Sequence, residues 1–235
     1  MILLTRSLFY VNYVYNGLSL QNGRQSNMDS LLLKAGQIGG KKSILAVVCD
    51  GVGSMAHGAY ASGAAAQMLG AWFEGAISYE RIGLRLRDAV IEINARVMEE
   101  SKLRNIDTAS TLSALVAIEN NYYIVHIGDS RIFSYRRGAL ALLTHDDVSE
   151  SGKLRACIGK ADNFFLHYSE GPASDTIFLL CTDGLYKRMD EGFLKARLDE
   201  WGKSARSEPM GALPEYVITR GEQDNITLAL IKIEG

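Results

Sequence analysis

The chain has 235 residues, of which 47% are hydrophobic and 22% are charged, so it can bury a sizeable core and is most simply one domain spanning residues 1–235. Its formal net charge is −2 and its Lys and Arg residues are scattered, which argues against the clustered basic surface of a nucleic-acid-binding protein. Three prolines and the lack of low-complexity runs argue against long disordered segments.

The apolar N-terminal stretch MILLTRSLFYVNY raises the question of a signal peptide or a membrane anchor. Arg6 interrupts this stretch and no basic segment precedes it. No apolar run in the chain approaches the roughly 18 residues that are needed to span a bilayer. We therefore interpret the stretch as a strand, and we expect a soluble, cytoplasmic protein without a membrane partner.

Strands are predicted at the start of the chain. Residues 2–20 and 30–36 are rich in Tyr, Val, Phe and Leu, which suits strands, and Asn22-Gly23 between them is a strong turn signal. The apolar run 44–49 is followed at once by Asp50 and by glycines. This pattern predicts a buried strand with Asp50 at its C-terminal end, where the backbone turns sharply.

Two helices are predicted next. Apolar residues recur at three- and four-residue steps from Ala61 to Phe73, and again from Ile82 to about Leu103. Each pattern gives one apolar face of a helix. Ser78 is placed to cap the start of the second helix.

The second half of the chain is predicted to be mainly β. Four short strands, with turns at Asn120-Asn121 and Arg137-Gly138, indicate an antiparallel meander over 110–118, 121–128, 131–136 and 139–143. Residues 145–163 are polar and predict a loop with at most one short helix. Further strands are expected near 164–168, at 176–181 and at 226–233. A short helix-prone region from Gly184 to Trp201 and a looser segment through Pro209 and Pro214 separate the last two.

Strands, then two long helices, then more strands indicate the α+β class, in which helices cover antiparallel sheets. A β-sandwich of two mainly antiparallel sheets, packed face to face with helices outside, would bury every apolar face named above. The cysteines Cys49, Cys157 and Cys181 lack metal-type spacing, so we expect neither disulfides nor a zinc site. We interpret Cys49 and Cys181 as buried core residues, the alternative being a redox-sensitive thiol near the site.

Four aspartates mark the ends of predicted core strands. Asp50, Asp129 and Asp183 follow apolar runs, and Asp224 precedes one. At about 4 Å and an effective dielectric near 20, two like charges repel by roughly 4 kcal/mol, so clustered carboxylates require protonation or hard cations, and oxygen ligands favour Mg²⁺ or Mn²⁺ over zinc. Two such ions would activate a water and clamp a phosphoryl group. The alternative for each aspartate alone is a plain turn.

The ordered motifs of the chain are similar to those of one known family. Nearly the whole chain resembles the metal-dependent serine/threonine phosphatases of the protein phosphatase 2C type. The motifs stand in family order: GRQSNMDS, VVCDGVGS, STLSALVA, IGDSRIFSYRRG, LLTHD, LLCTDGL and QDNIT. Each motif alone is a weak signal, but seven in order are specific. The resemblance implies a β-sandwich flanked by pairs of helices, a four-layer αββα arrangement.

The resemblance also implies a set of metal ligands. It implies that Asp50 bridges two Mn²⁺ or Mg²⁺ ions and that Gly51 offers its carbonyl oxygen to one of them. Asp183 and Asp224 would complete the first ion. Asp29 would lie beside the second ion through a bound water.

A third ion and a phosphate contact are implied as well. Asp129 resembles the ligand of a weaker third metal, and Arg24 matches the arginine that grips the substrate phosphate, a task suited to a planar, bidentate donor. Asp50 and Arg24 are therefore the candidate catalytic residues. The alternative for Arg24 is a solvated loop arginine.

Some positions differ from the family pattern. Val52 stands where many members carry a histidine that is a candidate general acid, so the leaving group must take its proton from a bound water or another group. We interpret His57 as a capping or surface residue and His126 as a core histidine with a hydrogen-bond partner. The segment 145–163 is shorter than the substrate flap of bacterial members, and the region before Asp224 shows no clear long helix.

These residues lead to one main hypothesis and two alternatives. The main hypothesis is a metal-dependent phosphatase that hydrolyses phosphoserine or phosphothreonine without a covalent intermediate. Its substrates would be phosphorylated proteins, including a partner serine/threonine kinase or the targets of that kinase. The first alternative is a catalytically decayed regulatory module that binds phosphoproteins, and the second is a phosphatase of small molecules.

Overall fold

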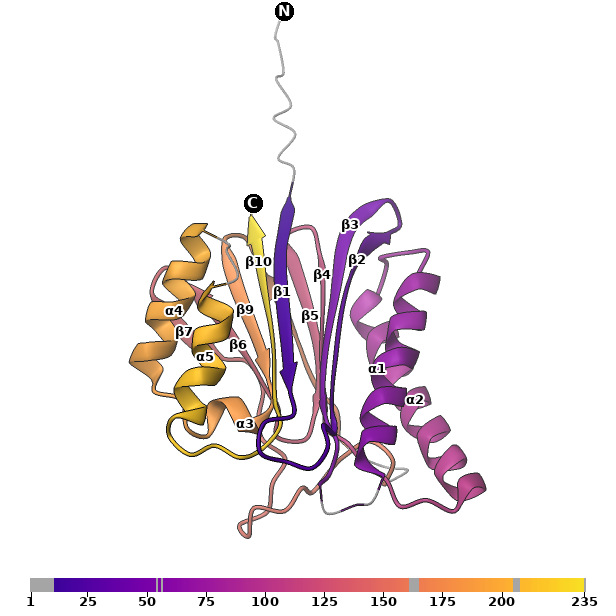
Figure 1. Ribbon diagram of the computed structural model, residues 1–235. Coiled ribbons are helices and arrows are strands. Elements are labelled where there is room, and N and C mark those ends of the chain that lie inside the picture. Colours follow the sequence, from indigo (N-terminus) through magenta and orange to yellow (C-terminus); the bar gives the residue numbers. More distant parts are fainter. Residues whose placement is uncertain (1–10, 54, 56, 161–164, 205–207, 235) are drawn as a thin grey trace, which may run out of the picture.

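The computed structural model describes residues 11–53, 55, 57–160, 165–204 and 208–234. Two five-stranded antiparallel sheets pack face to face in this part of the chain, and helices cover their outer faces (Figure 1). The first sheet has the order β1 (Asn12–Leu20), β10 (Ile226–Glu234), β9 (Thr176–Cys181), β6 (Arg131–Arg136) and β7 (Ala139–Leu142). The second has the order β2 (Asp29–Ile38), β3 (Lys41–Asp50), β4 (Leu112–Ile118), β5 (Asn121–Ile127) and β8 (His167–Pro172).

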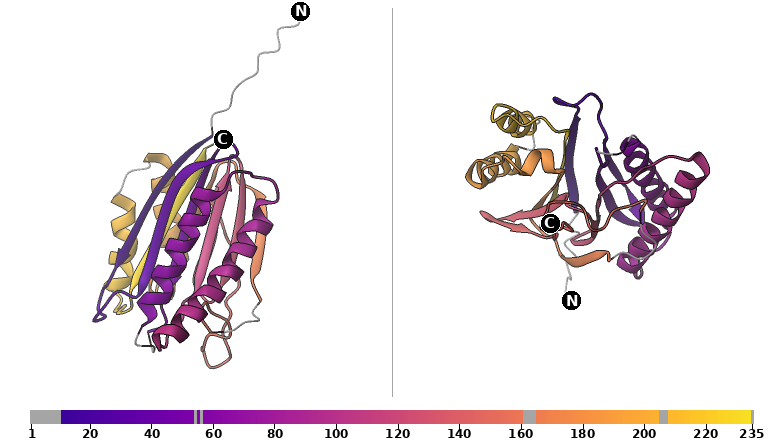
Figure 2. Two further views of the ribbon diagram at one scale, coloured as in Figure 1. Left: turned by 90° about the vertical axis from the view of Figure 1, so that its right-hand side faces the viewer. Right: turned by 90° about the horizontal axis from the view of Figure 1, so that it is seen from below.

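The helices form two outer layers. α1 (Gly58–Gly75) and α2 (Ile82–Arg104) cover the second sheet, and α4 (Glu191–Ser204) and α5 (Glu208–Ile218) cover the first, with the short α3 (Asp183–Tyr186) at one end. The view from below shows the order helices, sheet, sheet, helices (Figure 2). The predicted α+β sandwich is therefore confirmed. None of the described helices is both long and apolar enough to cross a bilayer.

Strand β3 shows why the apolar runs of the sequence are continuous. Ile44, Ala46 and Val48 point into the core between the two sheets. The alternate residues Leu45, Val47 and Cys49 point into the core beneath α1 and α2. Because both faces of this central strand are covered, it needs apolar residues at every position, unlike a strand with one face in water. Cys49 and Cys181 are fully buried free thiols, as predicted.

The main error of the sequence prediction concerns the region before Asp224. The segment through Pro214 was expected to be loose, but α5 occupies residues 208–218 with Pro214 inside it. A proline within a helix removes one backbone hydrogen bond. Here the buried residues Met210, Leu213 and Val217 pack against Leu198 and Trp201 of α4. This packing outweighs the unfavourable local propensity.

Smaller differences concern turns and caps. The turn between β4 and β5 uses Glu119, with φ of 50°, and Asn120, and not Asn120-Asn121. The N-cap residue of α2 is Arg81, and the Ser78 hydroxyl instead accepts a hydrogen bond from the Glu80 amide at 3.2 Å. β8 covers residues 167–172, displaced from the predicted 164–168. Residues 2–10, predicted as part of a strand, lie outside the described residues.

His126 on β5 is a fully buried histidine with three polar partners. Its Nε2 lies 3.1 Å from the carbonyl oxygens of Gly128 and His145, so it must carry the proton and donate. Its Nδ1 accepts from the Ser113 hydroxyl at 2.8 Å. Burial lowers the pKa of His126 to about 4, and His167 adds to this while Asp147 opposes it. His126 is thus a core residue, as predicted.

His126 makes the stability of the protein depend on pH. The unfolded histidine, with a pKa near 6.5, binds a proton in a pH range where the buried ring stays neutral. The neutral, buried His126 stabilises the folded state fully above about pH 6.5. This stabilisation, about 3 kcal/mol of unfolding free energy in total, is lost as the pH falls toward 4. We expect the free energy of unfolding, measured in urea, to fall about 1 kcal/mol per pH unit more steeply in the wild type than in His126→Gln between these limits. Equal slopes would contradict this assignment.

Candidate active site

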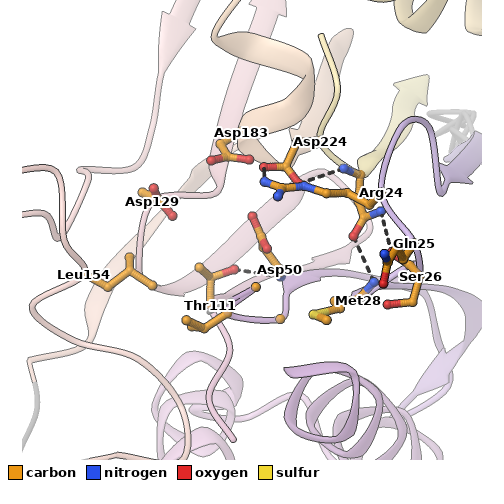
Figure 3. A pocket seen from close by; sticks show the side chains of 14 residues that line it. Arg24, Gln25, Ser26, Met28, Asp50, Thr111, Asp129, Leu154, Asp183 and Asp224 are labelled. Carbon is orange, nitrogen blue, oxygen red and sulfur yellow. Dashed lines mark hydrogen bonds and ion pairs between the residues drawn. The ribbon is translucent and has the colours of Figure 1, made fainter. Parts of the chain in front are cut away.

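A pocket of about 390 Å³ is lined by residues from the strand ends and from Asp183, the first residue of α3. Figure 1 shows α3 at one end of the sandwich. Strand ends and their following turns build the pocket. Asp50 ends β3, Asp129 lies between β5 and β6, Asp183 follows β9, and Asp224 precedes β10. Because the start of β10 lies beside the end of β9, the last two aspartates reach the same mouth. The close-up shows all four around one cavity (Figure 3).

Backbone hydrogen bonds hold Asp50 in place at the base of this pocket. The Asp50 amide donates to the Thr111 hydroxyl at 2.9 Å. The Asp50 carbonyl accepts from the Thr111 amide at 2.9 Å and from the Ser110 hydroxyl at 3.0 Å. The next residue must be glycine, because a Cβ on Gly51 would lie 2.6 Å from the Met28 carbonyl oxygen. The turn after β3 is therefore fixed on both sides of Asp50.

The gathered carboxylates change each other's ionisation. Burial raises the pKa of Asp50 well above its ordinary value, and the charges of Asp29 and Asp183 raise it further. Burial, with the charge of Asp183, also raises the pKa of Asp129 to about 6. Such carboxyl groups are stabilised in the ionised form by a nearby cation. An all-oxygen donor set of this kind fits Mg²⁺ or Mn²⁺.

Two side chains of the protein already supply positive charge to the pocket. The Arg24 guanidinium contacts both oxygens of Asp224, Nε to Oδ1 at 2.8 Å and Nη2 to Oδ2 at 2.6 Å. These hydrogen bonds hold the pKa of Asp224 below its ordinary value, although burial acts in the opposite direction. Lys187, four residues after Asp183, forms an ion pair with it. Sequence reasoning missed Lys187, although the i, i+4 spacing could have indicated the pair.

Asp29 is not among the residues that line the pocket. It is opposite Asp50 in the register of β2 and β3. Its Oδ2 accepts a hydrogen bond from the Thr182 hydroxyl at 2.9 Å. Burial raises the pKa of Asp29 to about 7, while hydrogen bonds from Thr227 and Thr182 act in the opposite direction. Asp29 therefore lies next to Asp50 and links β2 to Thr182 at the end of β9.

The mouth of the pocket contains residues that the sequence did not single out. Leu154, in the loop between β7 and β8, and Met28 form apolar parts of the wall. Thr111 belongs to the STLSALVA motif, but its contact with the Asp50 amide depends on the pairing of distant strands.

Val52 and His57, whose roles were predicted from the sequence, have different positions. Val52 lines the pocket. His57 is an exposed residue at the start of α1, and its side chain makes no capping hydrogen bond.

The carboxylates of the pocket do not converge on one point. Among the described residues, no three His, Cys, Asp or Glu side chains converge closely enough to form a metal centre as they stand. Two of the four pocket carboxylates are held by Arg24 and Lys187. The types of donor fit a hard divalent cation.

Comparison with known proteins identifies the family of the chain. The family model described as protein phosphatase 2C matches residues 17–216. The chain belongs to the protein phosphatase 2C family. Its curated relatives include the serine/threonine protein phosphatase PstP of Mycobacterium tuberculosis, which is 29% identical over 214 residues. The match covers 80% of this chain but only 40% of PstP.

Solved structures show the same protein phosphatase 2C fold. PppA, described as a key regulatory component of the T6SS in Pseudomonas aeruginosa, is 27% identical with a TM-score of 0.78, over 94% of this chain and 97% of PppA. The catalytic domain of PstP, solved with two manganese ions, is 22% identical with a TM-score of 0.80, over 96% of this chain and 100% of that chain. A bacterial serine phosphatase is 18% identical with a TM-score of 0.84, over 95% and 99% of the two chains.

The Thr111 hydroxyl should stabilise the turn that carries Asp50. Thr111→Val removes the acceptor of the Asp50 amide and the hydrogen bond to Ser130, which spans 2.7 Å. A buried donor without a partner costs about 1–3 kcal/mol, so we expect a loss of that size in the free energy of unfolding measured in urea. Thr111→Ser keeps the hydroxyl and is the matched control. Equal stability of the two variants would contradict the assignment.

Proposed function

We propose that this chain is a metal-dependent serine/threonine phosphoprotein phosphatase that hydrolyses phosphoserine and phosphothreonine. One observation carries the proposal: four aspartates and the guanidinium of Arg24 line a single pocket at the end of the sandwich. Carboxylates suit a hard cation, and a guanidinium suits a phosphate. The names of PstP and of the bacterial serine phosphatase support the same activity.

The metal ligands that we propose come from strand ends. Asp50, the Gly51 carbonyl, Asp183 and Asp224 would hold two Mn²⁺ or Mg²⁺ ions, and Asp129 would hold a third, weaker ion. Such ions lower the pKa of a coordinated water and neutralise the charge of a phosphoryl group. The two manganese ions in the crystal structure of the PstP catalytic domain support this choice of metal. Asp29, which pairs with Asp50 across β2 and β3, would lie beside the second ion through a bound water.

The remaining steps fall to side chains of the protein. Arg24 would bind two oxygens of the substrate phosphate through its planar fork and so orient the phosphorus toward the base of the pocket. No histidine lines the pocket among the described residues, and Val52 offers no proton. We therefore propose that the leaving alkoxide takes its proton from water.

The proposal predicts manganese-dependent hydrolysis of p-nitrophenyl phosphate. Asp50→Asn and Asp183→Asn should each lower kcat/KM by about 100-fold or more, because each removes a charged ligand that stabilises the transition state. The measurement is the initial rate with and without Mn²⁺. The matched control is Asp175→Asn, since Asp175 is exposed in the turn between β8 and β9, at the opposite end of the strands from Asp183. The proposal fails if the wild type is inactive or if the two site variants hydrolyse the ester as well as the control.

The rates at which different phosphate esters are hydrolysed test the proposed substrate class. We expect phosphothreonine and phosphoserine peptides to be hydrolysed faster than phosphotyrosine peptides or small phosphate esters of metabolites, as relatives named serine/threonine phosphatases imply. The measurement is phosphate release at equal substrate concentration and saturating Mn²⁺. Faster release from the small esters would favour a small-molecule phosphatase. Mn²⁺ binding without release from any substrate would favour a regulatory module.

The partners that we propose follow from this activity. A phosphoprotein phosphatase acts on proteins that a kinase has modified, so the substrates would include a partner serine/threonine kinase or its targets. The description of PppA as a regulatory component supports a role in regulation for this type of protein.

A further inference from the structure

The ion pair between Arg24 and Asp224 joins two residues with separate tasks in the proposed function. Arg24 would bind the substrate phosphate and Asp224 would bind a metal ion. Here the guanidinium fork contacts both oxygens of Asp224, at 2.8 and 2.6 Å. The close-up shows Arg24 reaching across the pocket to this carboxylate (Figure 3). In this arrangement neither residue is free for its task.

A divalent cation and the guanidinium compete for the same carboxylate. A metal ion bound to Asp224 would lie within a few ångströms of a full positive charge if the fork stayed in place, and the two would repel each other. Lys187 competes less strongly for Asp183, because its single ammonium group contacts only Oδ2 of that carboxylate. Arg24 is therefore the stronger internal competitor for a metal ligand.

The loop that carries Arg24 is fixed, whereas its side chain can move. Asn225 Nδ2 donates to the carbonyl oxygens of Gln21 and Ser26, at 2.8 and 3.0 Å, and so holds both ends of the loop around Arg24. The Asn22 side chain also donates to the carbonyls of Glu222 and Asp224 at 2.9 Å. The Arg24 side chain itself is 55% exposed. A rotation of this side chain can thus release the fork without moving the backbone.

We infer that Arg24 is a latch on Asp224: a metal ion that binds Asp224 displaces the guanidinium, which then becomes available to the substrate phosphate. This inference rests on the proposed function. It makes metal binding and phosphate binding cooperative through one side chain. By linkage, phosphate that holds Arg24 must raise the affinity for the metal by the same factor by which the metal raises the affinity for phosphate.

The test is a calorimetric titration of Mn²⁺ into the protein without phosphate or substrate. Arg24→Ala removes the competitor, and we expect Mn²⁺ to bind about fivefold more tightly than to the wild type. Arg24→Lys keeps the charge but cannot contact both oxygens, so it should also bind Mn²⁺ more tightly than the wild type, by a smaller factor. If only Arg24→Ala binds more tightly, long-range charge explains the result and the latch is wrong. If neither does, the latch is also wrong.

A matched control is available in the chain. Arg131 forms the same type of fork with Asp146, Nε to Oδ1 at 3.1 Å and Nη2 to Oδ2 at 2.8 Å, and neither residue lines the pocket. Arg131→Lys should leave Mn²⁺ affinity unchanged. A gain equal to that of Arg24→Lys would overturn the inference. Thermal unfolding of each variant without metal shows whether it is folded.

The displaced Arg24 side chain should bind phosphate once Mn²⁺ is present. At saturating Mn²⁺, inorganic phosphate should bind about tenfold less tightly to Arg24→Ala than to the wild type, because a bidentate charged contact is lost. Equal affinities would show that the released guanidinium does not reach phosphate. Both titrations are independent of turnover, so a protein without phosphatase activity can still show the latch, and an active one can lack it.

Discussion

Repulsion among carboxylates is the constraint on which the site depends. Asp50, Asp129, Asp183 and Asp224 line one pocket of about 390 Å³, and burial together with their mutual charge raises the pKa of Asp50 and of Asp129. A fold can hold such a cluster only if its framework is rigid. In the described part of the chain, two five-stranded sheets with three apolar layers between and outside them provide that framework.

The unfavourable charge is partly offset by the protein's own cations. Arg24 and Lys187 each pair with one of the pocket carboxylates. Both cationic side chains are more than half exposed, and exposed ion pairs contribute little to stability. Asp50 has no such ion pair among the described residues, and its backbone makes hydrogen bonds to Thr111 and Ser110. The charge is thus concentrated where a divalent cation would be most strongly attracted.

Much of the fold could be predicted from local patterns. The continuous apolar run of β3, which has both faces covered, predicts a buried strand, and the three- and four-residue spacing of α1 and α2 is a direct consequence of helix geometry. α5 could not be predicted in this way, because Pro214 opposes it locally and the packing of Leu213 and Val217 against α4 favours it. The prediction that Ser78 caps α2 was also wrong. The N-cap residue is Arg81, which adopts a left-handed conformation that no sequence signal indicated.

The sequence by itself determined which residues carry charge and that each aspartate stands at the end of an apolar run. Those facts depend only on chain order and on local backbone preference. Only the tertiary structure decided that the four strand ends meet at one pocket and that Arg24 contacts Asp224 across 200 residues. These contacts depend on the pairing of strands far apart in the chain, such as β9 with β10, where no hairpin turn sets the register. The pairing of Asp29 with Asp50 is different, because β2 and β3 form a hairpin.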